Sequence, residues 1–423
     1  MVDSHATARS LLASQLRGLG VGQVLHSANA HDARQHLENL GVDVLLVEYQ
    51  LDASTWGQHL IDAWRRDGLL PLRTVVVMLS SQASYQVVTQ VAESALDGFV
   101  IKPFTPAKLE DRLINAFQRK EALREVFDAI EADQHDQALV LCDKRYQRRG
   151  PYWTYAARLG AELAIRLEQL PLANAMYAAV LADKAVPWAK LGLARVLHAG
   201  GQVGRAVSTI ENLLSEEPTY ADAYDVMGRL HAEQGNLAGA IAAYRQAVEI
   251  TPFSVSRAQK YGILAWYAAE PDVAMAALEH AARIGGDAPD FDHQTLLLLA
   301  LARFQHGDAS GLQQCYSQLA GDLNRQLRAG QPPDARQHRL RRMGQMAQAL
   351  VAVQAQDRPT LQACLTPVAA DLLAQGFDVE AASNLLSLIA TSDAAGLTPQ
   401  QADQWVRCAG LRFCVSKQVT EML

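Results

Sequence analysis

Four polar or charged residues near the N-terminus each stand directly after a short apolar run, and they are Asp3, Glu48, Ser80 and Lys102. Two carboxylates can supply a nucleophile or hold a divalent cation, whereas a hydroxyl and an ammonium group can donate hydrogen bonds to oxygens that gain negative charge. Such chemistry needs the four side chains at one place. The elements that carry them must therefore end at the same edge of a sheet.

The apolar runs that precede these residues are typical of parallel strands. They lack polar alternation, as strands buried on both faces do, and they are Val24-Leu25, Val42–Val47, Thr74–Leu79 and Gly98–Ile101. Helical patterns follow the first three runs, at residues 33–40, 56–64 and 82–95. Alternation of strands and helices predicts an α/β doubly wound sheet, whose binding sites lie at the carboxyl ends of the strands.

From Val2 to about Phe117 the chain resembles the CheY-like receiver domain of bacterial two-component response regulators. The resemblance implies that an aspartate at the position of Glu48 accepts a phosphoryl group from a histidine kinase, with Mg²⁺ held beside it. It also implies that Ser80 and Lys102 bind the phosphoryl oxygens. Two further implications are an aromatic side chain at Phe99 that repacks and a cis bond between Lys102 and Pro103.

The acceptor side departs from the family pattern. Glu48 places its carboxylate one methylene further out than an aspartate, and Val2 stands where the family has a second acid beside Asp3. Mg²⁺ would rest on Asp3 and Glu48 alone, so we expect no required cofactor. Glu48 could pair with Lys102 as a partial mimic of phospho-aspartate or as an ordinary salt bridge. We expect a degenerate receiver, and a working phosphorylation switch stays open as the alternative.

The second part of the chain repeats with a period of 34 residues. Small, apolar or helix-ending residues recur at this spacing in six columns: Ala206, Ala240 and Ala274; Gly201, Gly235 and Ala269; Ala194, Gly228 and Gly262; Ile210, Tyr244 and Leu278; Leu213, Ala247 and Ala281; Pro218 and Pro252. A helix pair of this length cannot bury its apolar face alone, so the copies must stack into a solenoid. Residues 187–286 resemble three consecutive tetratricopeptide repeats.

Weaker copies flank these three, and we expect six to seven helix pairs in all. The spacing of Gly376, Ala381, Leu385 and Leu388 repeats that of the clean copies, and residues 330–333 break the array. The predicted domains are a receiver at 1–118, tetratricopeptide repeats at 119–334 and a C-terminal helical region at 335–423. No glycine or proline lies between Pro106 and Gly150. This segment favours rigid coupling, although two abutting helices with a short kink also fit it.

The resemblance implies that a protein partner binds the concave groove lined by the first helix of each pair. The candidate groove residues combine aromatic, arginine and carboxylate side chains, which suits a recognition surface; they are Trp188, Arg195, His198, Asp222, Asp225, Arg229, Glu233, Gln259, Trp266 and Tyr267. Trp188 and Trp266 could equally be partly buried packing residues.

Composition excludes several classes of function. The net charge is −7, and the dense basic stretch at 336–342 is an isolated nucleic-acid candidate, which we hold as the less favoured alternative. No apolar run reaches membrane-spanning length and no signal peptide precedes residue 10, so we expect a cytoplasmic protein without a membrane partner. The five cysteines show no metal-binding spacing, and no nucleotide loop or catalytic motif is present. We expect no enzyme.

The leading hypothesis is a two-component signalling adaptor whose solenoid binds a protein, with a histidine kinase or another regulator as a possible further partner. The first strand poses a separate question, because only Met1 and Val2 precede Asp3. A strand usually has ~5 to 6 residues. We therefore expect the natural chain to start several residues earlier, since the other strands are intact.

Overall fold

The structure is a computed structural model, and it describes residues 1–52, 55–81, 96–285, 288, 291–326, 334–372, 376–392 and 397–413. The chain divides into two compact units. The first unit is built mainly of residues 1–233 and the second mainly of residues from 255 onward. The units are described separately below.

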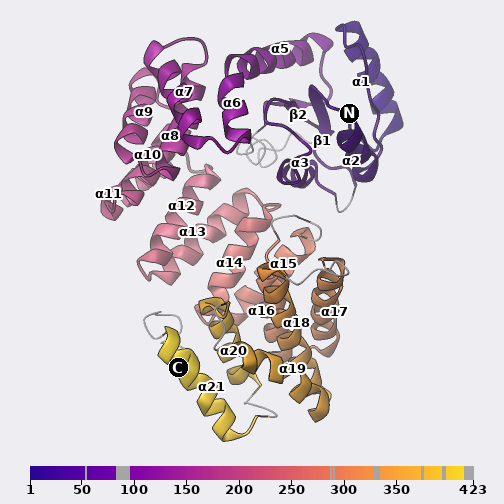
Figure 1. Cartoon of the computed structure of the whole chain (residues 1–423), viewed down its shortest axis with the longest axis vertical. Helices are drawn as coiled ribbons and strands as arrows, with labels where there is room; N and C mark the ends of the chain where they lie inside the picture. The colour runs from indigo at the N-terminus through magenta and orange to yellow at the C-terminus, as the bar shows by residue number, and fades with distance from the viewer. Residues whose placement is uncertain are drawn as a thin grey trace. The chain divides into compact units, whose positions relative to one another are not determined.

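A parallel sheet forms the start of the first unit (Figure 1). Its described strands are β1 (Val44–Glu48), β2 (Val75–Ser80) and β3 (Gly98–Ile101), in the order β1-β2-β3. Val2 extends this sheet as a single bridging residue, parallel to Val47 on one side and to Ser27 on the other. Its N–H donates to Leu46 O at 2.8 Å, and its carbonyl accepts from Glu48 N at 2.9 Å. Val2 thus occupies the central position that the first strand takes in a receiver fold.

Helices cover both faces of the sheet because the strand residues alternate between two apolar clusters. On one face, Leu46, Val77 and Val100 pack with α1 (Ala6–Gly18) and α5 (Pro106–Ala122). On the other face, Leu45, Val47 and Met78 pack with α2 (Ala30–Asn39) and α3 (Gly57–Arg66). The doubly wound α/β arrangement predicted from the sequence is therefore confirmed.

Three of the four predicted strands form, whereas the run at residues 24–25 does not form a strand. Residues 24 and 25 lie outside the strands; Ser27 forms a β-bridge, and the Leu25 carbonyl accepts from the Met1 amino group at 2.8 Å. The physical reason is that Val2 offers one residue of pairing on that side of the sheet. The helical pattern at 82–95 lies outside the described residues.

The rest of the first unit is helical. Leu123, which is buried, separates α5 from the short helix α6 with a φ of −110°, so the helices abut with a bend. The helices that follow are α6 (Arg124–Glu131), α7 (His135–Arg148), α8 (Trp153–Arg166), α9 (Leu170–Asp183), α10 (Pro187–Ala199), α11 (Val203–Glu216) and α12 (Ala221–Glu233). Neighbouring helices pack in pairs, and α10 also contacts α8 and α12, the first helices of the pairs beside it.

The second unit continues the same architecture after α13 (Leu237–Ile250). Its helices are α14 (Val255–Tyr267), α15 (Pro271–Gly285), α16 (Gln294–Gln305), α17 (Ala309–Gln326), α18 (Ala335–Gln354), α19 (Arg358–Asp371), α20 (Val379–Thr391) and α21 (Pro399–Phe413). The small residues of the repeat mark close crossings. A Cβ atom added to Gly262 on α14 would lie 2.8 Å from the Leu278 side chain on α15.

The solenoid is longer than the sequence spacing predicts. The described helices α6 to α21 number sixteen, which is enough for eight pairs, whereas six to seven pairs were expected. The expectation missed that the basic stretch after residue 334 begins a pair of its own, α18 with α19. The register assigned to Gly376–Leu388 is also wrong, because α20 packs on α16 and α18 as a first helix does. The break expected at 330–333 lies outside the described residues.

Candidate functional site

The predicted receiver residues meet at the carboxyl edge of the sheet. Asp3 follows the bridge at Val2, Glu48 ends β1, and Lys102 follows β3. The Lys102 Nζ donates to Asp3 Oδ2 at 2.7 Å and also to Glu48 Oε2. Both carboxylate residues are buried, with Asp3 1% and Glu48 6% exposed. One lysine therefore bridges two buried carboxylates.

Backbone N–H groups also donate hydrogen bonds to the two carboxylates. The His5 N–H donates to Asp3 Oδ1 at 2.8 Å, and the Ser81 N–H donates to the Glu48 carboxylate. Arg9 Nη1 donates to the backbone carbonyl of Asp3 at 2.6 Å. His5 and Arg9 were not predicted from the sequence, because both belong to the turn and helix that follow the strand rather than to a strand end.

Burial and hydrogen bonding shift the three pKa values. Burial and the neighbouring Asp3 charge raise the pKa of Glu48, and Lys102 offsets only part of that rise. Burial alone would raise the pKa of Asp3, but hydrogen bonds from Lys102 and His5 outweigh it and lower that pKa. Burial would lower the pKa of Lys102, yet the two carboxylates hold it above its ordinary value. The lysine stays charged at neutral pH.

Ser80 and Phe99 occupy neighbouring positions. Ser80 ends β2 and is buried, and its carbonyl accepts from the Lys102 N–H at 2.8 Å. Phe99 lies in β3, half-buried against the apolar cluster that packs with α2 and α3. The peptide bond between Lys102 and Pro103 is cis, as the family resemblance implies.

The residues present do not fit a receiver-type Mg²⁺ site. Asp3 and Glu48 both accept from Lys102, and the position of the second acid holds the buried Val2. A divalent cation prefers several oxygen ligands. Among the described residues, no cluster of three or more histidine, cysteine or acidic side chains could hold a metal ion.

The predicted groove residues of the first unit are joined from helix to helix. Arg195 on α10 pairs with Glu162 on α8 at 2.8 Å, and the same carboxylate accepts from Tyr177 OH at 2.7 Å. His198 on α10 contacts Glu233 on α12 at 2.5 Å. These contacts join three successive first helices, α8, α10 and α12, along one surface.

Trp188 combines packing with exposure on the same surface. Its ring lies 6.3 Å from that of Tyr177, and the guanidinium of Arg158 lies 5.3 Å from its centre. Asp222, Asp225 and Arg229 lie on α12, the first two half-buried and Arg229 exposed. An aromatic ring flanked by arginine and carboxylate groups can contact a peptide through both apolar and charged atoms.

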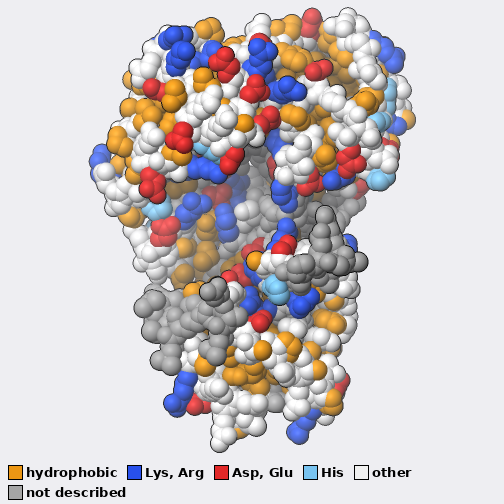
Figure 2. Space-filling model, viewed as in Figure 1, with side chains coloured by type: hydrophobic (Ala, Val, Ile, Leu, Met, Phe, Trp, Pro, Cys, Tyr) orange, Lys and Arg blue, Asp and Glu red, His pale blue; other side chains and the backbone are white. Residues whose placement is uncertain are grey.

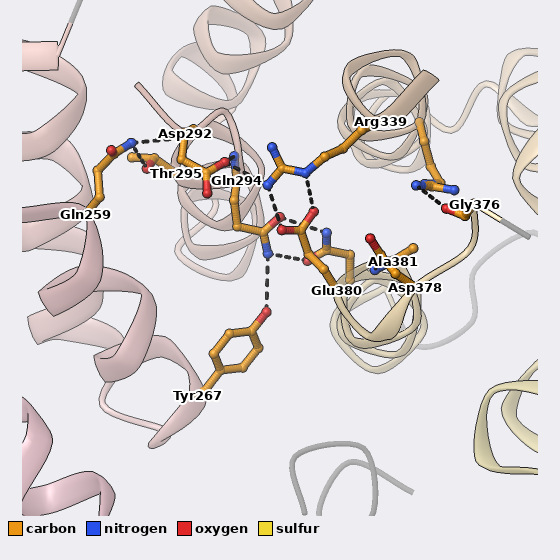
Figure 3. A network of polar contacts seen from close by, with 12 residues as sticks. Gln259, Tyr267, Asp292, Gln294, Thr295, Arg339, Gly376, Asp378, Glu380 and Ala381 are labelled. Atoms are coloured by element: carbon orange, nitrogen blue, oxygen red, sulfur yellow. Dashed lines mark hydrogen bonds and ion pairs between the residues drawn. The ribbon is translucent and has the colours of Figure 1, made fainter. Parts of the chain in front are cut away.

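The candidates on α14 belong to the second unit and differ from one another. Figure 3 shows the contacts of Gln259 and Tyr267. Gln259 is 4% exposed, and its side-chain amide donates to Asp292 O and Thr295 Oγ1 at 2.9 and 2.7 Å. It holds α14 to the start of α16, so its assignment to the groove surface is wrong. Tyr267 accepts from Gln294 at 3.2 Å, and Trp266 is half-buried.

Two of the four arginines in the basic stretch at 336–342, Arg339 and Arg342, form contacts within the second unit. Arg339 pairs with Glu380 and Asp292 at 2.6 and 2.7 Å, as Figure 3 shows. Arg342 is buried, donates to Gly376 O and lies 5.6 Å from the Phe377 ring. On the face drawn in Figure 2, acidic and basic side chains are interspersed rather than gathered by sign. Arg339 and Arg342 therefore hold α18 against α20 and against the segment before α20.

Comparison with known families matches two stretches within residues 1–259. Residues 1–114 match the response regulator receiver domain, and residues 112–259 match a tetratricopeptide repeat-like domain. The chain thus joins a receiver domain to a tetratricopeptide repeat-like domain. Within the described residues, no helix is both long enough and apolar enough to cross a bilayer.

Individual relatives are chemotaxis proteins over the receiver part. The chain is 27% identical over 119 residues to the chemotaxis protein CheY of Pseudomonas aeruginosa, covering 28% of this chain and 94% of that protein. It is 25% identical over 119 residues to the chemotaxis protein CheY-3 of Vibrio cholerae, covering 28% and 90%. A tetratricopeptide repeat protein structure from Parabacteroides merdae is similar at 13% identity and a TM-score of 0.36, covering 69% of this chain and 98% of that one.

Proposed function

We propose that the protein is a non-enzymatic signalling adaptor of a two-component pathway, with a receiver that is not phosphorylated in the usual way. The observation that carries this proposal is the bridge from Lys102 to both Asp3 and Glu48. In a working receiver the lysine would donate to an incoming phosphoryl group, whereas here two of its three N–H groups are directed at carboxylates. Glu48 acts instead as a built-in partner for Lys102.

Addition of beryllofluoride together with Mg²⁺ tests whether the receiver can be phosphorylated, since beryllofluoride bound to a carboxylate mimics a phosphoryl group. The full chain should show no Mg²⁺-dependent rise in melting temperature, because a ligand raises stability only if it binds the native state. Glu48→Asp shortens the carboxylate, and Glu48→Gln serves as the matched control that cannot accept the group. A Mg²⁺-dependent rise in the wild type that Glu48→Gln abolishes would favour the working phosphorylation switch instead.

We also propose that the solenoid binds a protein partner through the surface formed by α8, α10 and α12. The support is the run of half-buried and exposed aromatic, arginine and carboxylate side chains on these helices. A histidine kinase or another regulator is the class of partner that a receiver module suggests. The family of the repeats supports protein recognition, whereas the identity of the partner is part of the proposal.

Affinity capture with the full chain tests the groove. Arg229→Glu reverses an exposed charge on α12, and Arg205→Glu makes the same change on α11, the second helix of its pair. We expect Arg229→Glu to weaken capture of the partner at least tenfold while Arg205→Glu leaves it unchanged. Equal capture by all three proteins would place the binding surface elsewhere.

A further inference from the structure

A buried carboxylate at the start of β3 joins several elements of the first unit. Asp97 has a side chain that is 6% exposed and stands directly before β3. Its Oδ2 accepts from the Val76 N–H of β2 at 2.9 Å and from Lys120 Nζ at 3.2 Å. Its Oδ1 accepts from Arg119 Nη2 at 2.5 Å. One side chain therefore holds the sheet to the last turn of α5.

The two basic residues extend these contacts into the solenoid. Arg119 Nη1 donates to Tyr155 OH at 3.1 Å, and its guanidinium lies 4.7 Å from the centre of the Tyr155 ring on α8. Lys120 donates to Leu72 O and lies 4.8 Å from the ring of Phe127 on α6. A chain of direct contacts thus runs from β2 and β3 through α5 to α6 and α8.

A second link runs beside this one. The Leu72 N–H, in the segment between α3 and β2, donates to the carboxylate of Glu131 at the end of α6. Tyr152, at the start of α8, donates to Gln118 at 3.3 Å. Figure 1 shows α6 turning away from the axis of α5 at this point. The bend at Leu123 is therefore fastened on both sides rather than free.

Charge makes Asp97 hard to replace. Burial lowers the pKa of Lys120, and Arg65 and Arg119 lower it further, with Asp97 acting against them. Burial also lowers the pKa of Arg65, whose Nε is buried without a hydrogen-bond partner. A buried cation that loses its carboxylate is strongly unfavourable. Loss of the Asp97 charge should therefore loosen the junction on both its receiver side and its solenoid side.

We propose that Asp97 fastens the receiver sheet to the first helix pairs of the solenoid, so that β2, β3 and α5 to α8 open as one cooperative unit. The opposite end of β3 leads to Lys102, so the same strand carries the bridging lysine and the fastening carboxylate. The proposal goes beyond the adaptor function and does not depend on which protein the solenoid binds.

Hydrogen exchange of the full chain, followed by mass spectrometry, tests the proposal. Tyr155→Leu removes a side chain of α8 that is 44% exposed, so the helix itself should tolerate the change. We expect amides of β2 and β3 to exchange at least tenfold faster in this variant. Asp97→Asn should accelerate exchange in α7 and α8 by a similar factor, although its own residue lies in the receiver.

Asp67→Asn is the matched control, because it makes the same chemical change at an exposed ion pair with Arg34. It should leave exchange in α8 unchanged. The proposal is overturned if Tyr155→Leu accelerates only the solenoid helices around it while β2 and β3 exchange as in the wild type. Should Asp97→Asn fail to fold, Tyr155→Leu decides the question by itself.

Discussion

Lys102 bonds two buried carboxylates whose pKa values move in opposite directions. The pKa of Glu48 is raised because burial and the Asp3 charge outweigh its bond from Lys102. The pKa of Asp3 is lowered because hydrogen bonds from Lys102 and His5 outweigh burial. The two acids therefore have pKa shifts of opposite direction although both bond the same lysine. Their effects on stability should differ in sign as the pH changes.

For Asp3, the lowered pKa means that the folded state holds the proton less tightly than the unfolded state. Its stabilisation is present above the ordinary value of 3.8 and is lost as the pH falls through the folded-state pKa. For Glu48, the raised pKa reverses the sign. Its contribution is present below the ordinary value of 4.5 and is lost as the pH rises through the folded-state pKa.

We therefore expect opposite pH profiles for Asp3→Asn and Glu48→Gln when each is compared with the wild type by urea unfolding. The stability deficit of Asp3→Asn should grow as the pH rises from the lowered folded-state pKa towards 3.8 and should stay constant above that value. Glu48→Gln should gain stability relative to the wild type as the pH rises from about 4.5 through the raised folded-state pKa. Parallel profiles for the two variants would contradict the assignment of the shifts.

At the scale of elements, the sequence predicts where the site lies better than how its side chains bond. Apolar runs located β1, β2 and β3 to within two residues, and their ends placed Glu48, Ser80 and Lys102 at one edge. The bridge from Lys102 to both carboxylates depends on side-chain rotamers, which strand spacing does not specify. The run at 24–25 lacked its strand because pairing depends on the neighbouring segment as well as on local composition.

Helical spacing has a similar limit in the solenoid. The repeat register places a residue on a helix face, but whether that face is buried depends on which element packs over it. Gln259 lies one repeat of 34 residues after the half-buried Asp225, yet the start of α16 covers it. The last copy was misplaced for a related reason, since a spacing of small and apolar residues fits either helix of a pair and α20 is a first helix.

The contact between α16 and α20 offers a test at this scale. Gln294 and Asn384 are 2% and 3% exposed and exchange two hydrogen bonds, at 2.6 and 2.8 Å. Asn384→Leu leaves the Gln294 amide short of partners in the interior, which costs about 1–3 kcal/mol. Urea unfolding should show this loss. Gln294→Leu combined with Asn384→Leu should recover part of it, because no buried amide then remains unpaired.

Gln305 and Thr391 provide the control for that pair. They bond at 3.2 Å between the same two helices but at an exposed position. Gln305→Leu should change the unfolding free energy by less than about 0.5 kcal/mol, as surface substitutions usually do. If the double variant at Gln294 and Asn384 lost as much as the sum of the two single variants, the amide pair would not be the source of the effect.

At the scale of the whole molecule, the distribution of charge bears on whether the helical part binds a protein or a nucleic acid. The chain carries a net charge of −7. Arg339 and Arg342 of the basic stretch hold α18 within the second unit. Binding to DNA or RNA needs cations that reach phosphates, and each contact adds to a steep salt dependence. Binding to a protein does not need a surface of cations that reach phosphates.

We expect no binding of a labelled 30-base-pair duplex or of single-stranded RNA at 50 mM salt and micromolar protein, as followed by fluorescence anisotropy. The reason is that Arg339 and Arg342, two of the four arginines of the stretch, are engaged within the fold, and the acidic net charge repels phosphates at low salt. Binding that falls steeply between 50 and 200 mM salt would oppose this expectation. Arg336→Gln combined with Arg341→Gln would then show whether the remaining two arginines of the stretch carry it, since neither replaces an arginine that holds α18 in place.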